Sequence, residues 1–382
     1  MAITVQSSPG SYTSAHDALW HVVSSTNSSQ TNFKYVFDIL VNNTIVATIK
    51  NFPDEGGYGV FDAAPIVRNY ITSGFNCSGA SLLQYSDSFL HVDYTINYGE
   101  EYGNTTYTNL TSGSYKGWNY SLDPFRTSIS TYANKFLTSR DRTAGEVMNG
   151  EKFIITYFNA DLANVTATIQ KLKEDGTNDG SSSTGAGLGT NHGLILDLSP
   201  FAINSYLGTS FISSSTYAWR VTIGSDSMVV KQVCAPRFTP VSLIFQNQFG
   251  GYDAFIFRLL SRQQRRMQRT TYKSAEYRRV GTSMSYQTSS GVQYGGNQAF
   301  STSIDYGYKV VSNYLSVADY NLGAQLLASN EAYYYITQGD ANVYYPIIMR
   351  DSSWEEKNLT SDRMFNYELS FDLGNTQYSQ YR

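Results

Sequence analysis

The sequence has little of several residue types, and each scarcity narrows what the protein can be. Its 382 residues include only 2 Cys, 8 Pro and 4 His. Cys77 and Cys234 lie far apart in the sequence, so we expect no disulfide framework. None of the four histidines stands at a metal-ligand spacing. We therefore predict no metal site and no cofactor.

Signals for targeting and for catalysis are also scarce. No apolar run approaches the roughly 18 residues of a membrane-spanning helix, and the first residues have neither a basic nor an apolar region of the kind found in signal peptides. We therefore expect synthesis in the cytoplasm and no membrane span. The glycine-rich run 185–190 lacks the lysine of a phosphate-binding loop, and no nucleophile motif occurs. Acid pairs such as Glu100 and Glu101 suit glycoside hydrolysis only at a separation that the sequence does not give. We predict that the protein is not an enzyme.

Charged residues make up 15% of the chain, against about 25% in typical soluble domains. Aromatic residues, in contrast, reach 15%, and 32 of them are Tyr. Tyr, Thr, Val, Ile and Phe favour strands, while the many Ser, Asn and Gly residues favour turns. At roughly 100–200 residues per domain, we predict a mainly β fold with two or three β-sandwich or barrel-like domains and one short C-terminal helix, near 317–329.

The strand and turn patterns divide the chain into four segments. We predict an N-terminal β-sandwich domain at 1–115, with a hairpin that turns at Asn42 and Asn43. An irregular arm or linker follows at 116–150, and a second β domain with a glycine-rich hairpin tip at 151–236. The last segment, 237–382, is predicted to be a β domain that carries a basic stripe and the helix.

The basic stripe is the strongest charge feature of the chain. It comprises eight basic residues, interrupted by one acid: Arg258, Arg262, Arg265, Arg266, Arg269, Lys273, Arg278 and Arg279. The rest of the chain holds 19 basic and 30 acidic residues, a net charge of −11. We take the basic stripe as the candidate interface.

Three interpretations of the basic stripe stay open. Arginine makes planar, bidentate contacts with carboxylates, which suits docking onto an acidic patch of a neighbouring subunit. A solvated edge strand would use the charges to block aggregation. Contact with DNA would show as strong salt dependence. If the segment is helical, Arg262, Arg266 and Arg269 share one face.

Tryptophan suggests a different use of the surface, as a receptor- or glycan-binding module. Aromatic rings stack on sugars when they are exposed, and Trp118, Trp219 and Trp354 are the candidates for such glycan stacking. Burial in a core is the favoured interpretation for each of the three, and glycan stacking is the alternative.

Strand and turn segments near both ends of the chain carry a family resemblance. They are Ser25–Asp38, Gly57–Asp62, Asn247–Asp253, Tyr345–Ile348 and Phe365–Asp372. These segments resemble structural proteins of tailed bacteriophages that infect Bacteroidetes, crAss-like phages among them. The resemblance implies a virion component of the tail, neck or baseplate, or a capsid-associated protein, with no catalytic residues to carry over. We expect its partners to be copies of itself and other virion proteins, joined into a symmetric oligomer through Tyr-rich sheet faces and the basic stripe.

Overall fold

A computed structural model describes most of the chain. The residues outside the description are 1–2, 73, 76–82, 86–88, 123–127, 144, 235–236, 287, 290, 294, 339–340, 352, 354–364 and 379–382. The chain divides into two compact units. Unit 1 comprises Met1–Ala235, Ile244–Phe255 and Asn321–Glu331, and unit 2 comprises Pro236–Leu243, Ile256–Tyr320 and Ala332–Arg382. Strands dominate both units, which confirms the predicted mainly β fold.

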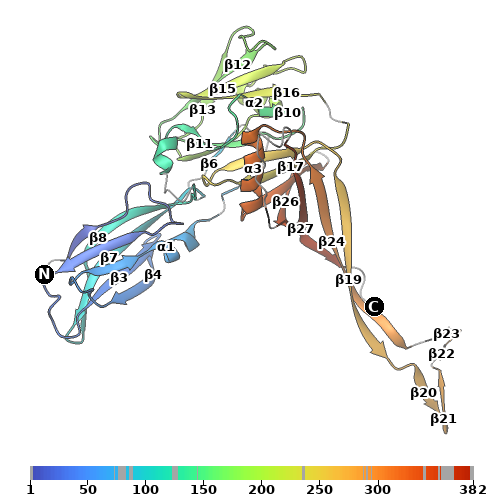
Figure 1. Ribbon diagram of the computed structural model, residues 1–382, viewed down its shortest axis with the longest axis horizontal. Coiled ribbons are helices and arrows are strands. Elements are labelled where there is room, and N and C mark those ends of the chain that lie inside the picture. The colour runs from blue at the N-terminus through green and yellow to red at the C-terminus, as the bar shows by residue number, and fades with distance from the viewer. Residues whose placement is uncertain are drawn as a thin grey trace. The chain divides into compact units, whose positions relative to one another are not determined.

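The N-terminal part of unit 1 is a β-sandwich (Figure 1). Its first sheet has the order β1 (Ile3–Ser7), β2 (Trp20–Ser25), β5 (Gly59–Asp62), and its second the order β4 (Thr44–Asn51), β3 (Lys34–Val41), β7 (His91–Tyr102), β8 (Thr105–Trp118). The short helices α1 (Ala64–Val67) and η1 (Arg68–Tyr70) follow β5. Apolar side chains from both sheets form one core, with Phe37, Ile39 and Ile96 fully buried.

The hairpin between β3 and β4 forms where the sequence predicts it. Asn42 and Asn43 both have positive φ, 51° and 60°. Two consecutive residues in the left-handed region are the requirement of a two-residue type I′ turn, and asparagine tolerates that region better than most residues. The turn sets the pairing of Val41 with Thr44, and an irregularity between Ile39 and Leu40 shifts the register farther along the hairpin.

A second β-sandwich follows within unit 1. One sheet has the order β10 (Gly145–Val147), β16 (Asp226–Gln232), β15 (Ala218–Ile223), β12 (Thr166–Leu172), β13 (Ser183–Gly187), and the other the order β6 (Leu83–Tyr85), β14 (Gly193–Asp197), β11 (Ile154–Phe158), β9 (Lys135–Phe136). Helix α2 (Pro200–Leu207) and η2 (Ile129–Tyr132) complete it. Trp219 and Phe153 lie in the shared core.

The segment 116–150 is not the irregular arm or linker that we predicted. It contains the end of β8, η2, β9 and β10, and the side chains of Phe136 and Val147 are fully buried in the core of the second sandwich. The short strand β10 pairs in parallel with β16. Burial of these apolar side chains makes the segment part of the folded body.

Unit 2 is built on a long antiparallel sheet. The strand order is β18 (Tyr252–Phe257), β17 (Val241–Gln246), β25 (Ala332–Gln338), β26 (Ala341–Met349), β27 (Glu368–Tyr378), β24 (Gly296–Val311), β19 (Arg262–Ser274), in which β17 and β18 contribute residues to both units. Two small hairpins lie between β19 and β24: β20 (Tyr277–Val280) with β21 (Ser283–Tyr286), and β22 (Thr288–Ser289) with β23 (Val292–Gln293). Helix α3 (Val317–Ala328) confirms the predicted C-terminal helix.

Candidate assembly arm and sandwich pocket

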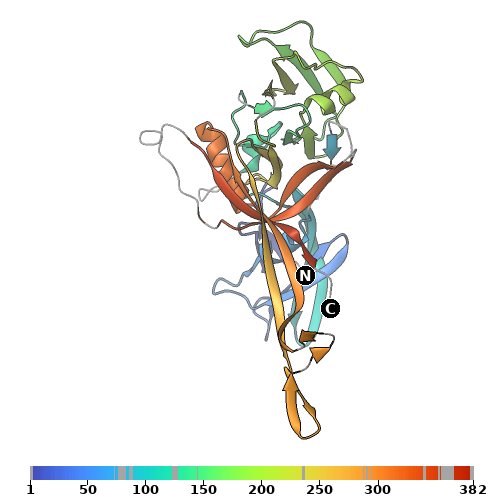
Figure 2. The same ribbon diagram turned by 90° about the vertical axis from the view of Figure 1, so that its right-hand side faces the viewer.

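Most of the basic stripe lies on a long hairpin of unit 2. Strand β19 pairs with β24 along its whole length, from Arg262 opposite Lys309 to Ser274 opposite Gly296. Strand β27 pairs with β24 only as far as Ser303, which lies opposite Tyr378. Beyond that point β19 and β24 continue as a two-stranded ribbon, which ends in the hairpin β20–β21 (Figures 1 and 2). We call residues 262–311 the arm.

Strand β19 of the arm is almost uncovered, whereas β24 is partly covered from Ser301 onward and Val310 is fully buried. Every residue of β19 except Ser274 is exposed. The exposed side chains include large apolar ones, with Met267 at 49%, Phe300 at 55% and Met284 at 64% of their full accessible area. A two-stranded ribbon that buries so little is at best marginally stable in water. Strand β19 and the tip of the arm therefore expose large apolar side chains that unit 2 does not bury.

Strand alternation gives the arm two different faces. On one face Arg265, Met267 and Arg269 lie opposite Tyr306, Ile304 and Thr302. The Arg265 guanidinium stands 5.4 Å from the centre of the Tyr306 ring, within cation–π range. We call this the tyrosine face.

The opposite face of the arm carries Arg262 and Arg266. Arg262 lies opposite Lys309, and Arg266 lies opposite Asp305. The helical alternative is therefore wrong, because in a strand Arg269 points away from Arg262 and Arg266. Basic charge is present on both faces of the ribbon.

An ion pair fixes the base of the arm. Arg350 binds both carboxylate oxygens of Asp372, and Arg266 lies 4.0 Å from the same carboxylate. Asp372 pairs across the sheet with Gly307. A Cβ atom at position 307 would come within 2.7 Å of both Arg350 and Asp372. Glycine is therefore needed for the bidentate pair to lie flat against β24.

The tip of the arm combines aromatic, basic and apolar side chains. Tyr277 and Tyr286 lie opposite each other in β20 and β21, with ring centres 4.5 Å apart. The next pair on the same face is Arg279 with Met284. Gly281 has a φ of 62° in the turn between the two strands. All four side chains are exposed, so the tip presents them together.

The structure corrects part of the predicted site. Seven members of the basic stripe are exposed on the arm, but Arg258 is buried at 8% exposure and lies outside it. Trp118 and Trp219 are buried too, and their indole nitrogens donate to the carbonyl oxygens of Ser11 and Leu198. Stacking of these two tryptophans on a glycan is thereby contradicted. Trp354 lies outside the described residues.

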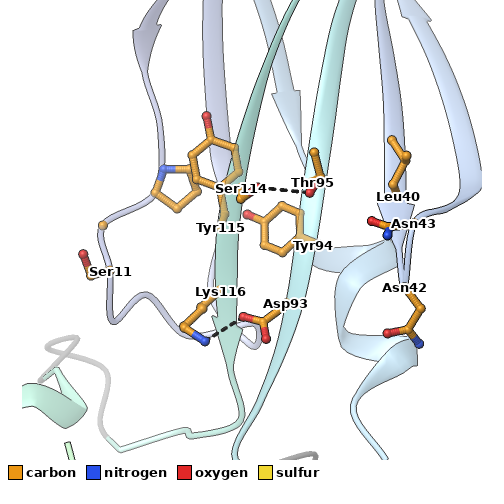
Figure 3. Close-up of a pocket in the computed structure, with 12 residues that line it drawn as sticks. Ser11, Leu40, Asn42, Asn43, Asp93, Tyr94, Thr95, Ser114, Tyr115 and Lys116 are labelled. Carbon is orange, nitrogen blue, oxygen red and sulfur yellow. Dashed lines mark hydrogen bonds and ion pairs between the residues drawn. The ribbon is translucent and has the colours of Figure 1, made fainter. Parts of the chain in front are cut away.

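The N-terminal sandwich has a pocket of about 490 Å³ that the sequence does not indicate. Three segments line it: the loop at residues 9–11, the β3–β4 turn, and the paired strands β7 and β8. Figure 3 shows an ion pair between Asp93 and Lys116 and a hydrogen bond between Thr95 and Ser114 on these strands. The Nζ atom of Lys116 lies 2.7 Å from the Asp93 carboxylate.

A hydrogen-bonded core network supports one side of the pocket. The two ring nitrogens of His21 contact the hydroxyls of Tyr98 at 2.9 Å and Tyr94 at 3.1 Å. The Tyr98 hydroxyl in turn contacts that of Tyr115 at 2.9 Å, and both Tyr94 and Tyr115 line the pocket. Burial lowers the pKa of His21 to about 4 and raises the pKa values of Tyr94 and Tyr98. These groups therefore stay neutral at pH 7.

The paired acids of β7 have structural partners. Glu100 is fully buried and accepts hydrogen bonds from Ser25 and Asn27, while Glu101 forms ion pairs with Lys34 and Lys50. Hydrogen bonding from Lys50 is the main reason that the pKa of Glu101 lies well below its usual range. Both carboxylates therefore tie strands together, and they do not form a pair that shares one open site.

Asp253 is the most deeply buried carboxyl with a shifted pKa. Its side chain is 0% exposed, and loss of hydration raises its pKa to about 6, although Arg140 favours the charged form. Asn247 donates from Nδ2 to Asp253 at 2.8 Å and to the Leu137 carbonyl at 2.7 Å. The Asn247–Asp253 segment thus acts as a structural turn.

Comparisons with known proteins add little. No protein-family model matches the chain, and no curated protein sequence matches it. Among solved structures, the complex of Dpr2 Ig1-Ig2 with DIP-Theta Ig1-Ig3 is similar at 10% identity and a TM-score of 0.19, over 99% of this chain and 90% of that chain. This likeness is too remote to carry an argument about function.

Two searches of the described residues were negative. None of their helices has the length and apolar character needed to cross a membrane. The same residues contain no cluster of three or more His, Cys, Asp or Glu side chains arranged to hold a metal ion.

Proposed function

We propose that this protein is a non-enzymatic structural component of a bacteriophage virion, which assembles by docking its arm onto neighbouring subunits. The arm carries the proposal: both faces of β19 are exposed, and the arm presents Arg, Tyr, Met and Phe side chains together. Arginine and tyrosine are enriched at the centres of protein interfaces. The virion setting rests on the sequence resemblance to phage structural proteins, with the tail, neck or baseplate as its place and a capsid-associated role as the alternative.

Of the three interpretations of the basic stripe, docking accounts for the most side chains. Strand β19 is an edge strand of its sheet, and charges on such an edge do discourage aggregation. That role alone would not require the exposed apolar side chains of Met267, Met284 and Phe300. Contact with phosphates would not require them either. A protein surface with acidic and apolar parts matches both kinds of side chain.

Charge favours a second copy of the chain as one of the partners. Unit 1 holds 21 acidic and 13 basic residues, a net charge of −8, and the arm holds 8 basic and 2 acidic residues, a net charge of +6. Two different surfaces, one on each copy, make a heterologous contact, and such contacts close into rings when the rotation between subunits permits. This is the arrangement that we propose for the symmetric oligomer.

The proposal is tested by measuring self-association. Arg265→Ala combined with Arg269→Ala removes two charges from the tyrosine face, and we expect at least about tenfold weaker association by sedimentation. The matched control, Lys135→Ala with Lys173→Ala, removes two exposed charges from unit 1 and should leave association unchanged.

Three results would reject docking as the role of the arm. Association that is equal in both double variants would remove the arm from the interface. Tight binding of duplex DNA by the wild-type chain, lost steeply with added salt, would favour the nucleic-acid interpretation. Cleavage of a glycan or peptide by the purified chain would favour an enzyme.

A further inference from the structure

We infer that the pocket of the N-terminal sandwich binds a neutral, hydroxyl-rich ligand, namely a sugar unit of a glycan. This inference is independent of the arm, because every residue that lines the pocket belongs to unit 1. The volume of about 490 Å³ lies within the range of about 300–1,000 Å³ that is usual for small-molecule pockets.

The charges of the pocket argue for a neutral ligand. Among the described residues that line it, Lys116 is the single cation and Asp93 the single anion, and they form an ion pair with 2.7 Å between Nζ and Oδ1. A phosphate or carboxylate ligand would have to take Lys116 from Asp93 and leave that carboxylate without its partner. A neutral ligand can bind both groups and leave the pair intact.

The remaining polar groups suit hydroxyls as partners. Thr95 and Ser114 contribute hydroxyl groups, and Asn42 and Asn43 contribute amides, so donors and acceptors are both present. Thr95 and Ser114 are bonded to each other at 3.2 Å, and each hydroxyl keeps further capacity. A purely apolar ligand would cover these groups without satisfying them, at a cost in binding free energy.

The pocket also has apolar surface for the C–H face of a sugar ring. Leu40 lies opposite Thr95 in the pairing of β3 with β7, so its half-buried side chain shares a sheet face with the Thr95 and Ser114 hydroxyls. Tyr115 alternates with Ser114 along β8, so its ring points to the opposite face of the sheet, where its hydroxyl contacts that of Tyr98.

The first test fills the pocket. The probes are glucose, galactose, mannose and N-acetylglucosamine, measured with the full chain by saturation-transfer NMR and calorimetry. Ser114→Trp places a large side chain on an exposed lining position, and we expect the affinity for the bound sugar to fall at least tenfold. Thr108→Trp, at an exposed position of the same strand outside the pocket, is the matched control and should bind as the wild type does.

A second test addresses the charge argument. Lys116→Met leaves the Asp93 carboxylate without its cation, and we expect affinity for the neutral sugar to fall while the cationic sugar glucosamine gains affinity. Lys309→Met is the matched control, since Lys309 is also a half-exposed strand lysine paired with a carboxylate, that of Glu368.

Each outcome decides the question. Binding of a neutral sugar that Ser114→Trp abolishes and Thr108→Trp preserves, with unchanged thermal unfolding of both variants, supports the inference. The inference fails if none of the four sugars binds, if Ser114→Trp binds as tightly as the wild type, or if sialic acid or glucose 6-phosphate binds more tightly than the neutral sugars. If Ser114→Trp does not fold, the comparison of Lys116→Met with Lys309→Met decides instead, because neither of these substitutions adds volume to the core.

Discussion

Strands β3 and β19 are both long antiparallel strands, yet their surroundings are opposite. Strand β3 is paired on both sides, and six of its eight residues are buried. Strand β19 is paired on one side only, and none of its thirteen residues is buried. Strand β3 thus has two backbone ladders and a buried face, whereas β19 has one ladder and no buried face, and both differences favour higher stability for β3. Strand β3 is therefore held by the core of its own sandwich, whereas β19 has no such core beneath it among the described residues.

The largest expected effect comes from removing a core side chain of unit 1. Trp219 is fully buried between the sheets of the second sandwich, and Trp219→Ala should lower the free energy of unfolding of unit 1 by about 3–5 kcal/mol. Met284→Ala at the exposed tip of the arm should change the free energy of unfolding of unit 2 by less than about 0.5 kcal/mol. Denaturant unfolding measures both. Similar losses in the two variants would end the distinction between core and arm.

The second prediction concerns pH and the buried Asp253. Burial raises its pKa from 3.8 to about 6, so its contribution to stability is fully present below pH 3.8 and is lost as pH rises through about 6. The difference of about two units corresponds to roughly 3 kcal/mol. Asp253→Asn cannot ionise, so its stability relative to the wild type should rise by up to that amount between pH 4 and pH 7.

The control for this pH effect is an exposed carboxyl whose pKa moves the other way. Hydrogen bonds from Thr177 lower the pKa of Asp175, so Asp175→Asn should gain no stability relative to the wild type as pH rises. Denaturant titrations that follow tryptophan fluorescence at pH 4, 5.5 and 7 measure both variants. A pH-independent difference between Asp253→Asn and the wild type would contradict the assignment.

A smaller effect is expected at the base of the arm. In Gly307→Ala the added Cβ displaces Arg350 from Asp372, and loss of this charged hydrogen-bond pair should destabilise unit 2 by about 1–2 kcal/mol. Ser303→Ala in the same strand adds no such contact and serves as the control. Calorimetry of both variants checks the size, and an unchanged unfolding temperature for Gly307→Ala would show that the ion pair does not hold the arm.

The smallest effect on stability is expected at the arm tip, where a substitution should weaken association much more than it lowers stability. Tyr286→Ser removes one ring of the Tyr277–Tyr286 pair, which should cost the isolated subunit less than about 1 kcal/mol. Association should nevertheless weaken, because the ring is exposed for contact. Hydrogen exchange offers a parallel measurement: amides of 262–274 should exchange much faster than those of β3 in the monomer and become protected in the oligomer.

The sequence predicted those features that depend on neighbouring residues. The turn at Asn42 and Asn43 and the helix α3 follow from local chemistry and periodicity, and both are confirmed. Helix α2 was missed although it has local signals: Pro200 stands in its first turn, and Gly208 ends it with a φ of 65°. That helix could have been predicted from the sequence.

Features formed by segments that are distant in the sequence could not be predicted from it. Phe136 and Val147 stand in apolar runs of only two residues, and most of their core partners lie in strands farther along the chain. The sequence showed the basic stripe. It did not show that the stripe pairs with β24, because residues 275–295 separate the two strands along the chain. The pocket draws on three segments, and no single one of them carries a motif for it.

The length of β19 has a geometric consequence. Thirteen residues of extended chain span about 40 Å at roughly 3.3 Å per residue, which exceeds the diameter of about 34 Å of a sphere whose radius of gyration is the roughly 13 Å of a compact 100-residue domain. In the assembly that we propose, an arm of this length reaches across the width of an adjacent subunit. Its contacts would then tolerate small changes in the spacing between subunits.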